Sequence, residues 1–176
     1  MVLKNHIIVG AIGAVAVFPL IGPLRAVVFF LSSVLIDSDH YIDYLWRTRK
    51  QNKFPAGLSP KAMFKYYDQF YAHQFDKRQL GFSLFHTVEI FIIVYLLSIF
   101  VHYGFLDQVF FLTVLAGMAY HMIFDVISLA WIKLHFIRAY SIVEYFIRFK
   151  KMLRRGVNPN DYSKEMFSLS RGSEKK

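Results

Sequence analysis

The chain has 176 residues and no cysteine, and 56% of its residues are hydrophobic, with a mean hydropathy of +0.37. Its length suits one domain, but ordinary soluble domains contain about 45–50% apolar residues. The composition therefore excludes intrinsic disorder, a collagen-like chain and a disulfide scaffold. The net charge of +9 is compatible with nucleic acid or with an anionic membrane surface. We favour the membrane and expect no nucleic-acid partner, because the basic residues flank apolar segments.

The first apolar segment, Ile7–Ile36, contains one charged residue, Arg25, and exceeds the length of about 20 residues that one membrane span needs. Pro19 and Pro23 interrupt it, which predicts a helical hairpin. A cleaved signal peptide is the alternative for the first arm, because Lys4 precedes the apolar stretch. The immediate second arm favours the hairpin. The predicted arms are Val2–Phe18 and Leu24–Tyr44.

A polar connection, Trp46–Leu80, follows the hairpin and contains eight Lys or Arg residues. Ser59 and Pro60 are typical of a helix start. The next stretch, Lys61–Phe75, is predicted to form a short helix. Its many Phe and Tyr residues favour the membrane–water interface.

Two further apolar segments, Phe82–Tyr103 and Gln108–Lys133, are predicted to be the third and fourth spans, with a tight turn between them. The segment Arg138–Arg155 has the pattern of a basic interfacial helix, although a helix packed back on the bundle is the alternative. Its predicted apolar stripe consists of Ile142, Phe146, Phe149 and Leu153. We therefore expect an all-α integral membrane bundle of about four helices over residues 1–133, with an interfacial loop at 46–80, a basic amphipathic helix at 134–156 and a polar tail at 157–176.

The basic residues predict the orientation. Nineteen of the twenty-one Lys and Arg residues lie in the Trp46–Leu80 loop or in Lys133–Lys176, and none lies in the turn between the last two spans. The positive-inside rule places the loop and both termini in the cytoplasm. We expect a bacterial or archaeal cytoplasmic membrane.

Acidic and histidine side chains within the spans indicate a functional site, because a charge at the bilayer centre costs at least about 2.5–3.5 kcal/mol on insertion scales. Alternating helix directions bring six of them to the cytoplasmic half of the bundle. Imidazole and carboxylate form a good ligand set for Zn²⁺ and an acceptable one for Mn²⁺ or Fe²⁺. The predicted ligands of a divalent metal, most plausibly zinc, are His6, Asp37, His40, His86, His121 and Asp125.

Spacing along the helices supports this set. His121 and Asp125 are four residues apart and Asp37 and His40 are three apart, so each pair shares a helix face. Each element also has a structural interpretation: a hydrogen-bonded pair within one helix, a polar helix end, or an interfacial histidine at His86. Convergence of the four helices on one side of the membrane favours the metal site.

The same residues resemble a known family. His6, the Asp-Ser-Asp-His run at 37–40, His86 and the His-x-x-x-Asp pair at 121–125 occur in the order seen in the YdjM-like family of membrane-bound metal-dependent hydrolases. The resemblance covers residues 1–130, with Ile36 where that family has proline. The order is more distantly similar to zinc-dependent phospholipase C, and this resemblance implies that the histidines and aspartates hold zinc.

We therefore expect a membrane-embedded metal-dependent hydrolase, with a phospholipid or another membrane-associated phosphoester as substrate. Asp39, or Glu89 as second choice, is the predicted catalytic proton acceptor. Two other classes stay open. An ion-pathway or transporter-like protein would use the same side chains as a proton relay, and a structural membrane scaffold would bind no metal.

Overall fold

The computed structural model describes residues 3–39, 83–101, 103–131 and 138–156. This described part is all-helical and contains no strand. The chain divides into two units, Met1–Ser38 with Leu84–His135 and Asp39–Ser83 with Phe136–Lys176. The predicted loop helix, Lys61–Phe75, and the tail at 157–176 lie outside the described residues. The described elements are α1 (Leu3–Leu35), the 3₁₀ helix η1 (Leu84–His86), α4 (Val88–Phe100), α5 (Gln108–Trp131) and α6 (Ile142–Arg154).

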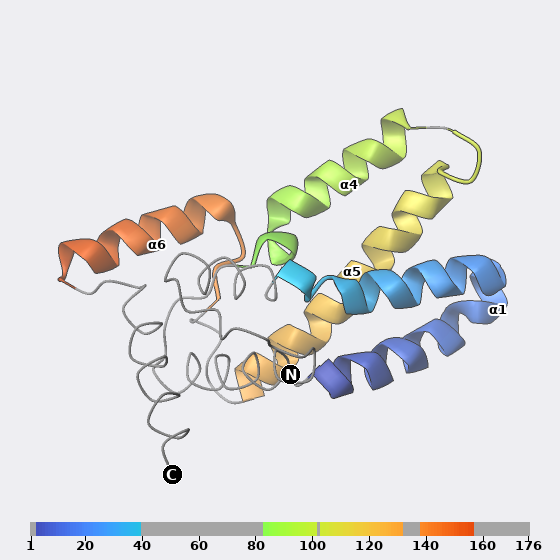
Figure 1. Cartoon of the computed structure of the whole chain (residues 1–176), viewed down its shortest axis with the longest axis horizontal. Coiled ribbons are helices and arrows are strands. Elements are labelled where there is room, and N and C mark those ends of the chain that lie inside the picture. Colours follow the sequence, from blue (N-terminus) through green and yellow to red (C-terminus); the bar gives the residue numbers. More distant parts are fainter. Residues whose placement is uncertain (1–2, 40–82, 102, 132–137, 157–176) are drawn as a thin grey trace, which may run out of the picture. The chain divides into compact units, whose positions relative to one another are not determined.

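Helix α1 folds back on itself, as the dark-blue and light-blue arms in Figure 1 show. The reversal is at Gly22, whose φ of 77° and ψ of 171° are non-helical, and Pro19 and Pro23 lie on either side. Glycine fits here because it alone adopts this backbone conformation without a steric cost. The predicted hairpin is present, but its second arm ends at Leu35 and not at Tyr44; residues 40–44 lie outside the described part.

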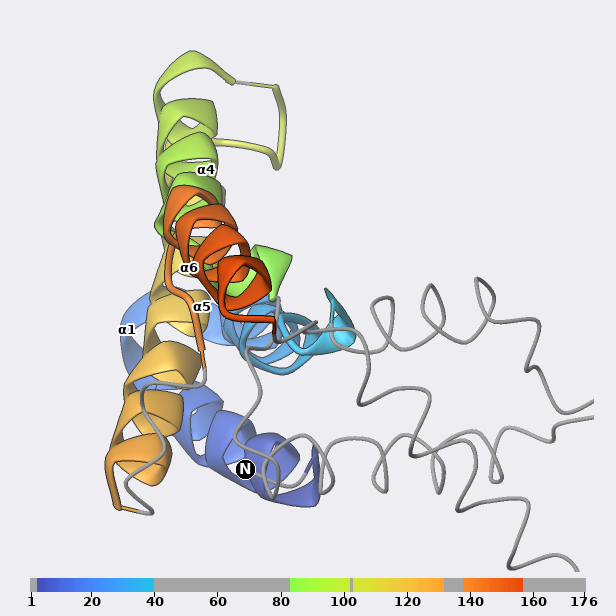
Figure 2. The same ribbon diagram turned by 90° about the vertical axis from the view of Figure 1, so that its left-hand side faces the viewer.

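Helix α5 is the central element of the first unit, because it contacts both α1 and α4 (Figures 1 and 2). Its 24 residues extend about 36 Å, enough for a hydrocarbon core of about 30 Å. Within the described ranges, two helices are long and apolar enough to cross a membrane: α5 and the Asn5–Leu35 part of α1. In α1 that length is divided between the two arms of the hairpin.

Helix α4 is shorter than the predicted span Phe82–Tyr103. Its 13 residues extend about 20 Å, less than the hydrocarbon core of a bilayer. The backbone is extended at Thr87 and at Val101, which end the helix on its two sides. The Thr87 hydroxyl donates to the Leu84 carbonyl over 2.8 Å. This bond closes the short helix η1, which precedes α4 and contains His86.

Many apolar side chains of the first unit are exposed, and many of its buried side chains are polar. Leu20, Phe100 and Trp131 are 84%, 77% and 86% exposed. Exposed apolar side chains in this number indicate a surface that contacts lipid or another protein. The described part of the unit buries five apolar residues, Ala26, Phe29, Ile36, Met118 and Leu129, and eight polar ones, His6, Ser33, His86, Thr87, Ser98, Thr113, His121 and Asp125.

In the second unit, α6 begins at Ile142 and not at the predicted Arg138. Ser141 is the N-cap, and its hydroxyl accepts a hydrogen bond from the Val143 amide over 3.1 Å. A serine in extended conformation satisfies one of the free amides of the first turn and so fixes the helix start. The predicted C-terminal end is correct to within one residue, because α6 ends at Arg154.

At the other end of the unit from His6, an ion pair joins the α1 hairpin to the start of α5. The Arg25 guanidinium lies 3.0 Å from Asp107, whose other carboxylate oxygen accepts from the Phe110 amide over 2.7 Å and caps α5. Both side chains are more than a third exposed, so the ion pair itself is worth at most about 1 kcal/mol.

We predict that Asp107→Ala lowers the free energy of unfolding by about 1–2 kcal/mol, because it removes both the cap and the ion pair. Arg25→Ala removes only the ion pair and costs less than Asp107→Ala. Asp107→Asn should behave like Arg25→Ala, since asparagine also caps helices. Unfolding in detergent measures all three; an equal loss for Arg25→Ala and Asp107→Ala would contradict the capping role.

Candidate metal centre

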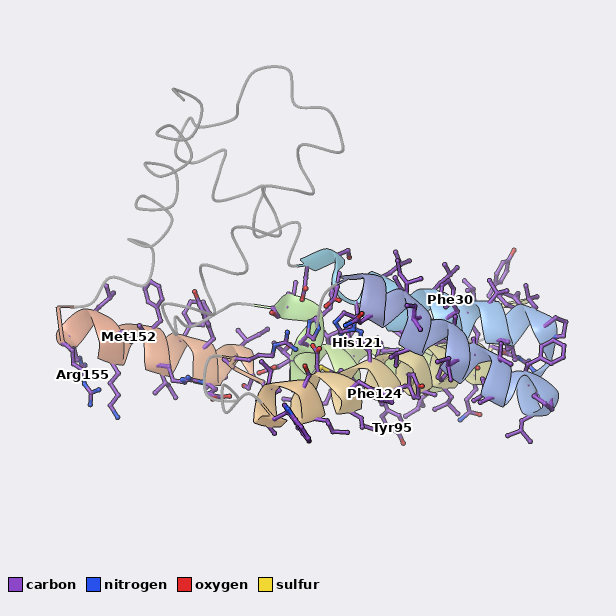
Figure 3. All side chains as sticks on the ribbon, turned by 90° about the horizontal axis from the view of Figure 1, so that it is seen from below. Phe30, Tyr95, His121, Phe124, Met152 and Arg155 are labelled. Carbon is purple, nitrogen blue, oxygen red and sulfur yellow. The ribbon has the colours of Figure 1, made fainter. Side chains whose placement is uncertain are left out.

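Five of the predicted ligands meet at one end of the first unit. His6 lies near the start of α1, Asp37 directly follows its second arm, and His86 ends η1. His121 and Asp125 are one turn apart on α5, so they face the same side. Figure 3 shows His121 below the end of α1 and beside η1. The hairpin of α1 is what brings His6 and Asp37 together, although thirty residues separate them in the chain.

The three imidazoles surround two carboxylates. One oxygen of Asp37 lies 3.3 Å from Nε2 of both His86 and His121, and its other oxygen lies 3.5 Å from Nε2 of His6. Asp125 repeats this pattern at 3.5 Å from His6, 3.4 Å from His121 and 3.7 Å from His86. His6 and His121 also stack, with ring centroids 4.3 Å apart.

Ligand atoms of four of these residues, His6, Asp37, His121 and Asp125, all lie within 4.8 Å of one another, so the group could hold a metal ion. His86 lies beside it through the contacts just given. With neutral imidazoles, the five side chains carry a charge of −2. Burying such a charge is costly unless a cation compensates it, and His6, His86, His121 and Asp125 are all buried. A divalent ion has the compensating charge.

A hydrogen bond to the backbone determines the orientation of His121. Its Nδ1 lies 2.7 Å from the Ser33 carbonyl oxygen, which can only accept, so Nδ1 carries a proton. In the neutral ring, Nε2 then presents a lone pair to the carboxylates and to His86 Nε2, 3.3 Å away. Metal-binding histidines commonly donate their second ring nitrogen in this way. The alternative is a doubly protonated His121 that donates to the carboxylates.

The spacing also fits a shared cation. Charge-assisted N–H···O bonds are about 2.7–2.9 Å long, whereas the N···O distances here are 3.3–3.7 Å. Two ligands at about 2.0–2.1 Å from a tetrahedral zinc lie about 3.3–3.4 Å apart. The donor set and its spacing therefore suit a divalent ion held by four or five side chains.

Among the described residues, Asp39 and Glu89 are not part of this group. His40 lies outside the described residues, so its role as a ligand stays a prediction. Asp39 is buried but belongs to the second unit, and Glu89 lies in the first turn of α4, half-buried. The sequence did not indicate the Ser33 carbonyl as the partner of His121, because every residue has a backbone carbonyl. The only available signal was its position one helical turn before Asp37.

Comparisons with protein-family models, with curated proteins and with solved structures found no match for this chain. They lend no support to the family resemblance, so the functional argument rests on the residues of the cluster.

Proposed function

We propose that this chain is a membrane-embedded metal-dependent hydrolase, in which the YdjM-like resemblance reflects a shared ligand set. The observation that carries the proposal is the group of three histidines and two aspartates at close range, whose charge is −2 when the imidazoles are neutral. We take the ion to be zinc, because a mixed imidazole and carboxylate set suits it and several of the N···O distances are close to the separation of two ligands on one zinc ion.

The membrane part of the proposal is a bundle of about four spans in a cytoplasmic membrane, with both termini inside. The apolar surface of the first unit and the two helices of sufficient length and hydropathy support it. Helix α4, at 13 residues, would need neighbouring residues or local bilayer thinning to cross.

The cluster would hold the ion through His6, Asp37, His86, His121 and Asp125. A divalent ion there would supply Lewis acidity toward an ester or phosphoryl oxygen and would acidify water near neutral pH. Asp39, two residues after Asp37, is our proposed proton acceptor. The Ser33 carbonyl keeps His121 in one tautomer and orientation. A phospholipid or another membrane-associated phosphoester is the substrate class that we propose.

The hydroxyl groups within the helices argue against a proton relay that runs through them. Among the described residues, the buried hydroxyls of Ser33, Ser98 and Thr113 each donate to a carbonyl of their own helix, over 2.6–2.8 Å. Their protons are thus engaged locally. A relay would need them oriented toward one another along the bundle.

Metal analysis and hydrolysis assays on the full chain, purified without chelators, test the proposal. We expect one or two equivalents of a divalent ion, and hydrolysis of a phosphodiester or of a fluorescent phospholipid that Asp125→Asn reduces at least a hundredfold. Asp107→Asn, which makes the same chemical change outside the cluster, should leave metal content and hydrolysis unchanged. If the protein contains metal but hydrolyses no ester, the proposed hydrolase activity is wrong and the metal centre stands. If the protein contains no metal, both proposals are wrong.

A further inference from the structure

Helix α6 is held by local bonds and not by an apolar core. Besides the Ser141 cap, Glu144 accepts from the Tyr140 amide over 2.9 Å and pairs with Arg148 at 3.0 Å. Gly156 follows the helix end with a φ of 75°, and its amide donates to the Leu153 carbonyl over 3.0 Å. No residue of α6 is fully buried, so these local bonds contribute a large share of what holds the helix.

The apolar face of the helix has two parts that differ in exposure. Ile142, Tyr145, Phe149 and Met152 repeat at helical spacing and are half-buried. The adjoining stripe is open to solvent and consists of Val143, Phe146, Ile147 and Leu153, which are 47–63% exposed. The predicted stripe, Ile142, Phe146, Phe149 and Leu153, follows the line where the half-buried and exposed parts meet.

Two cations lie within the exposed stripe. Lys150 and Arg154 are both exposed. Lys150 lies seven residues after Val143 and Arg154 seven residues after Ile147, so each cation lies about two helical turns further along the same stripe. Lysine and arginine side chains can lay their methylene stems along apolar surface and keep the charge at its edge. Over α6 and Arg155, five basic residues stand against the single acid Glu144, which Arg148 already pairs. Figure 3 shows Arg155 at the end of the helix.

We propose that the exposed stripe of α6, defined as Val143, Phe146, Ile147, Lys150, Leu153 and Arg154, docks on the surface of an anionic lipid bilayer. Aliphatic and aromatic side chains interleaved with cations match the boundary between acyl chains and anionic headgroups. The charges alone would also suit a nucleic acid, but such a partner leaves the four large apolar side chains of the stripe without a role. This inference does not depend on the metal centre or on hydrolysis.

Because the chain has no cysteine, single cysteines report on individual positions of the full-length protein. We would introduce Phe146→Cys in the stripe and Lys151→Cys beside it, and attach an environment-sensitive fluorophore to each. The protein would be reconstituted in nanodiscs of phosphatidylcholine alone, or of phosphatidylcholine with phosphatidylglycerol. Nitroxide-labelled lipid serves as the quencher.

Docking predicts a blue-shifted label at position 146 in the anionic discs, quenched several-fold more strongly than the label at position 151. Added salt should reduce the quenching. Lys150→Gln with Arg154→Gln should weaken docking by roughly 25-fold, at about fivefold for each cation near the surface. Both residues are exposed, so the helix itself should persist in these variants.

Three results would overturn the proposal. Equal quenching at positions 146 and 151 would mean that the stripe does not face lipid. Salt-independent burial of position 146 in both kinds of disc and in detergent would mean that it packs on protein. Protection of position 146 by RNA in detergent, without an effect of anionic lipid, would identify nucleic acid as the partner.

Discussion

Removal of the metal by a chelator is expected to lower the unfolding midpoint of the full-length protein by about 5–15 °C. At a hundred- to thousandfold excess over Kd, a ligand that binds only the folded state adds about 2.7–4.1 kcal/mol to stability. The proposed ligands come from the start of α1, from Asp37 just after its end, from η1 and from α5, so the ion would hold these elements together. Thermal unfolding with and without chelator, followed by re-addition of zinc, measures the effect. A midpoint that chelation does not change would contradict it.

Replacing both carboxylates distinguishes a bound metal ion from the alternative interpretation, a doubly protonated His121. In the metal interpretation, Asp37→Asn with Asp125→Asn abolishes the effect of zinc on the unfolding midpoint. The same double variant should raise the stability of the metal-free protein, because two buried charges at close range repel each other. If His121 is an imidazolium paired with these carboxylates, the double variant should instead destabilise the chelated protein, because a buried cation loses its partners.

The main features of the cluster could be predicted from residue spacing and helix direction. His121 and Asp125 are one helical turn apart, and the Pro19–Pro23 region marked the reversal that places His6 beside Asp37. These inferences depend only on helix geometry and on where a helix cannot continue. The role of each side chain as a ligand stays a prediction, because geometry shows proximity and not occupancy.

Other features depend on tertiary contacts that sequence patterns do not contain. The predicted span Phe82–Tyr103 contains polar residues in its first half, but their pattern does not indicate that extended backbone at Thr87 divides the segment into η1 and α4. A threonine inside an apolar segment does not by itself indicate such a break. The half-buried and exposed residues of α6 belong to one apolar face in the sequence, and only packing distinguishes Phe149 from Phe146.

The second large effect on stability is expected at Gly117, where α5 lies close to α1. A Cβ at this position would lie 2.5 Å from the Phe29 carbonyl oxygen and would also meet the Ser32 hydroxyl. The serine side chain can rotate, but the carbonyl belongs to the backbone of α1 and cannot move without the helix. Small residues at such positions allow membrane helices to pack closely. Gly117 therefore sets the distance between the two helices that carry the cluster.

Gly117→Ala is expected to destabilise the protein by about 1–3 kcal/mol, the usual cost of overpacking. Helix propensity alone predicts the opposite sign, a gain of about 1 kcal/mol for alanine over glycine, so the sign of the change decides between the two effects. Unfolding in detergent would show it. Ala116→Leu adds more volume at the neighbouring exposed position and should change stability by less than about 0.5 kcal/mol.

Gly117→Leu should also lower the metal content, because His121 lies one turn further along α5 and bonds to the Ser33 carbonyl of α1 over 2.7 Å. Moving the helices apart would break this bond and displace His121 from Asp37, whereas His121 and Asp125 would stay one turn apart on α5. Metal analysis of Gly117→Leu beside Ala116→Leu makes the comparison. Full metal content in a destabilised but folded Gly117→Leu protein would mean that the ion does not bridge α1 and α5.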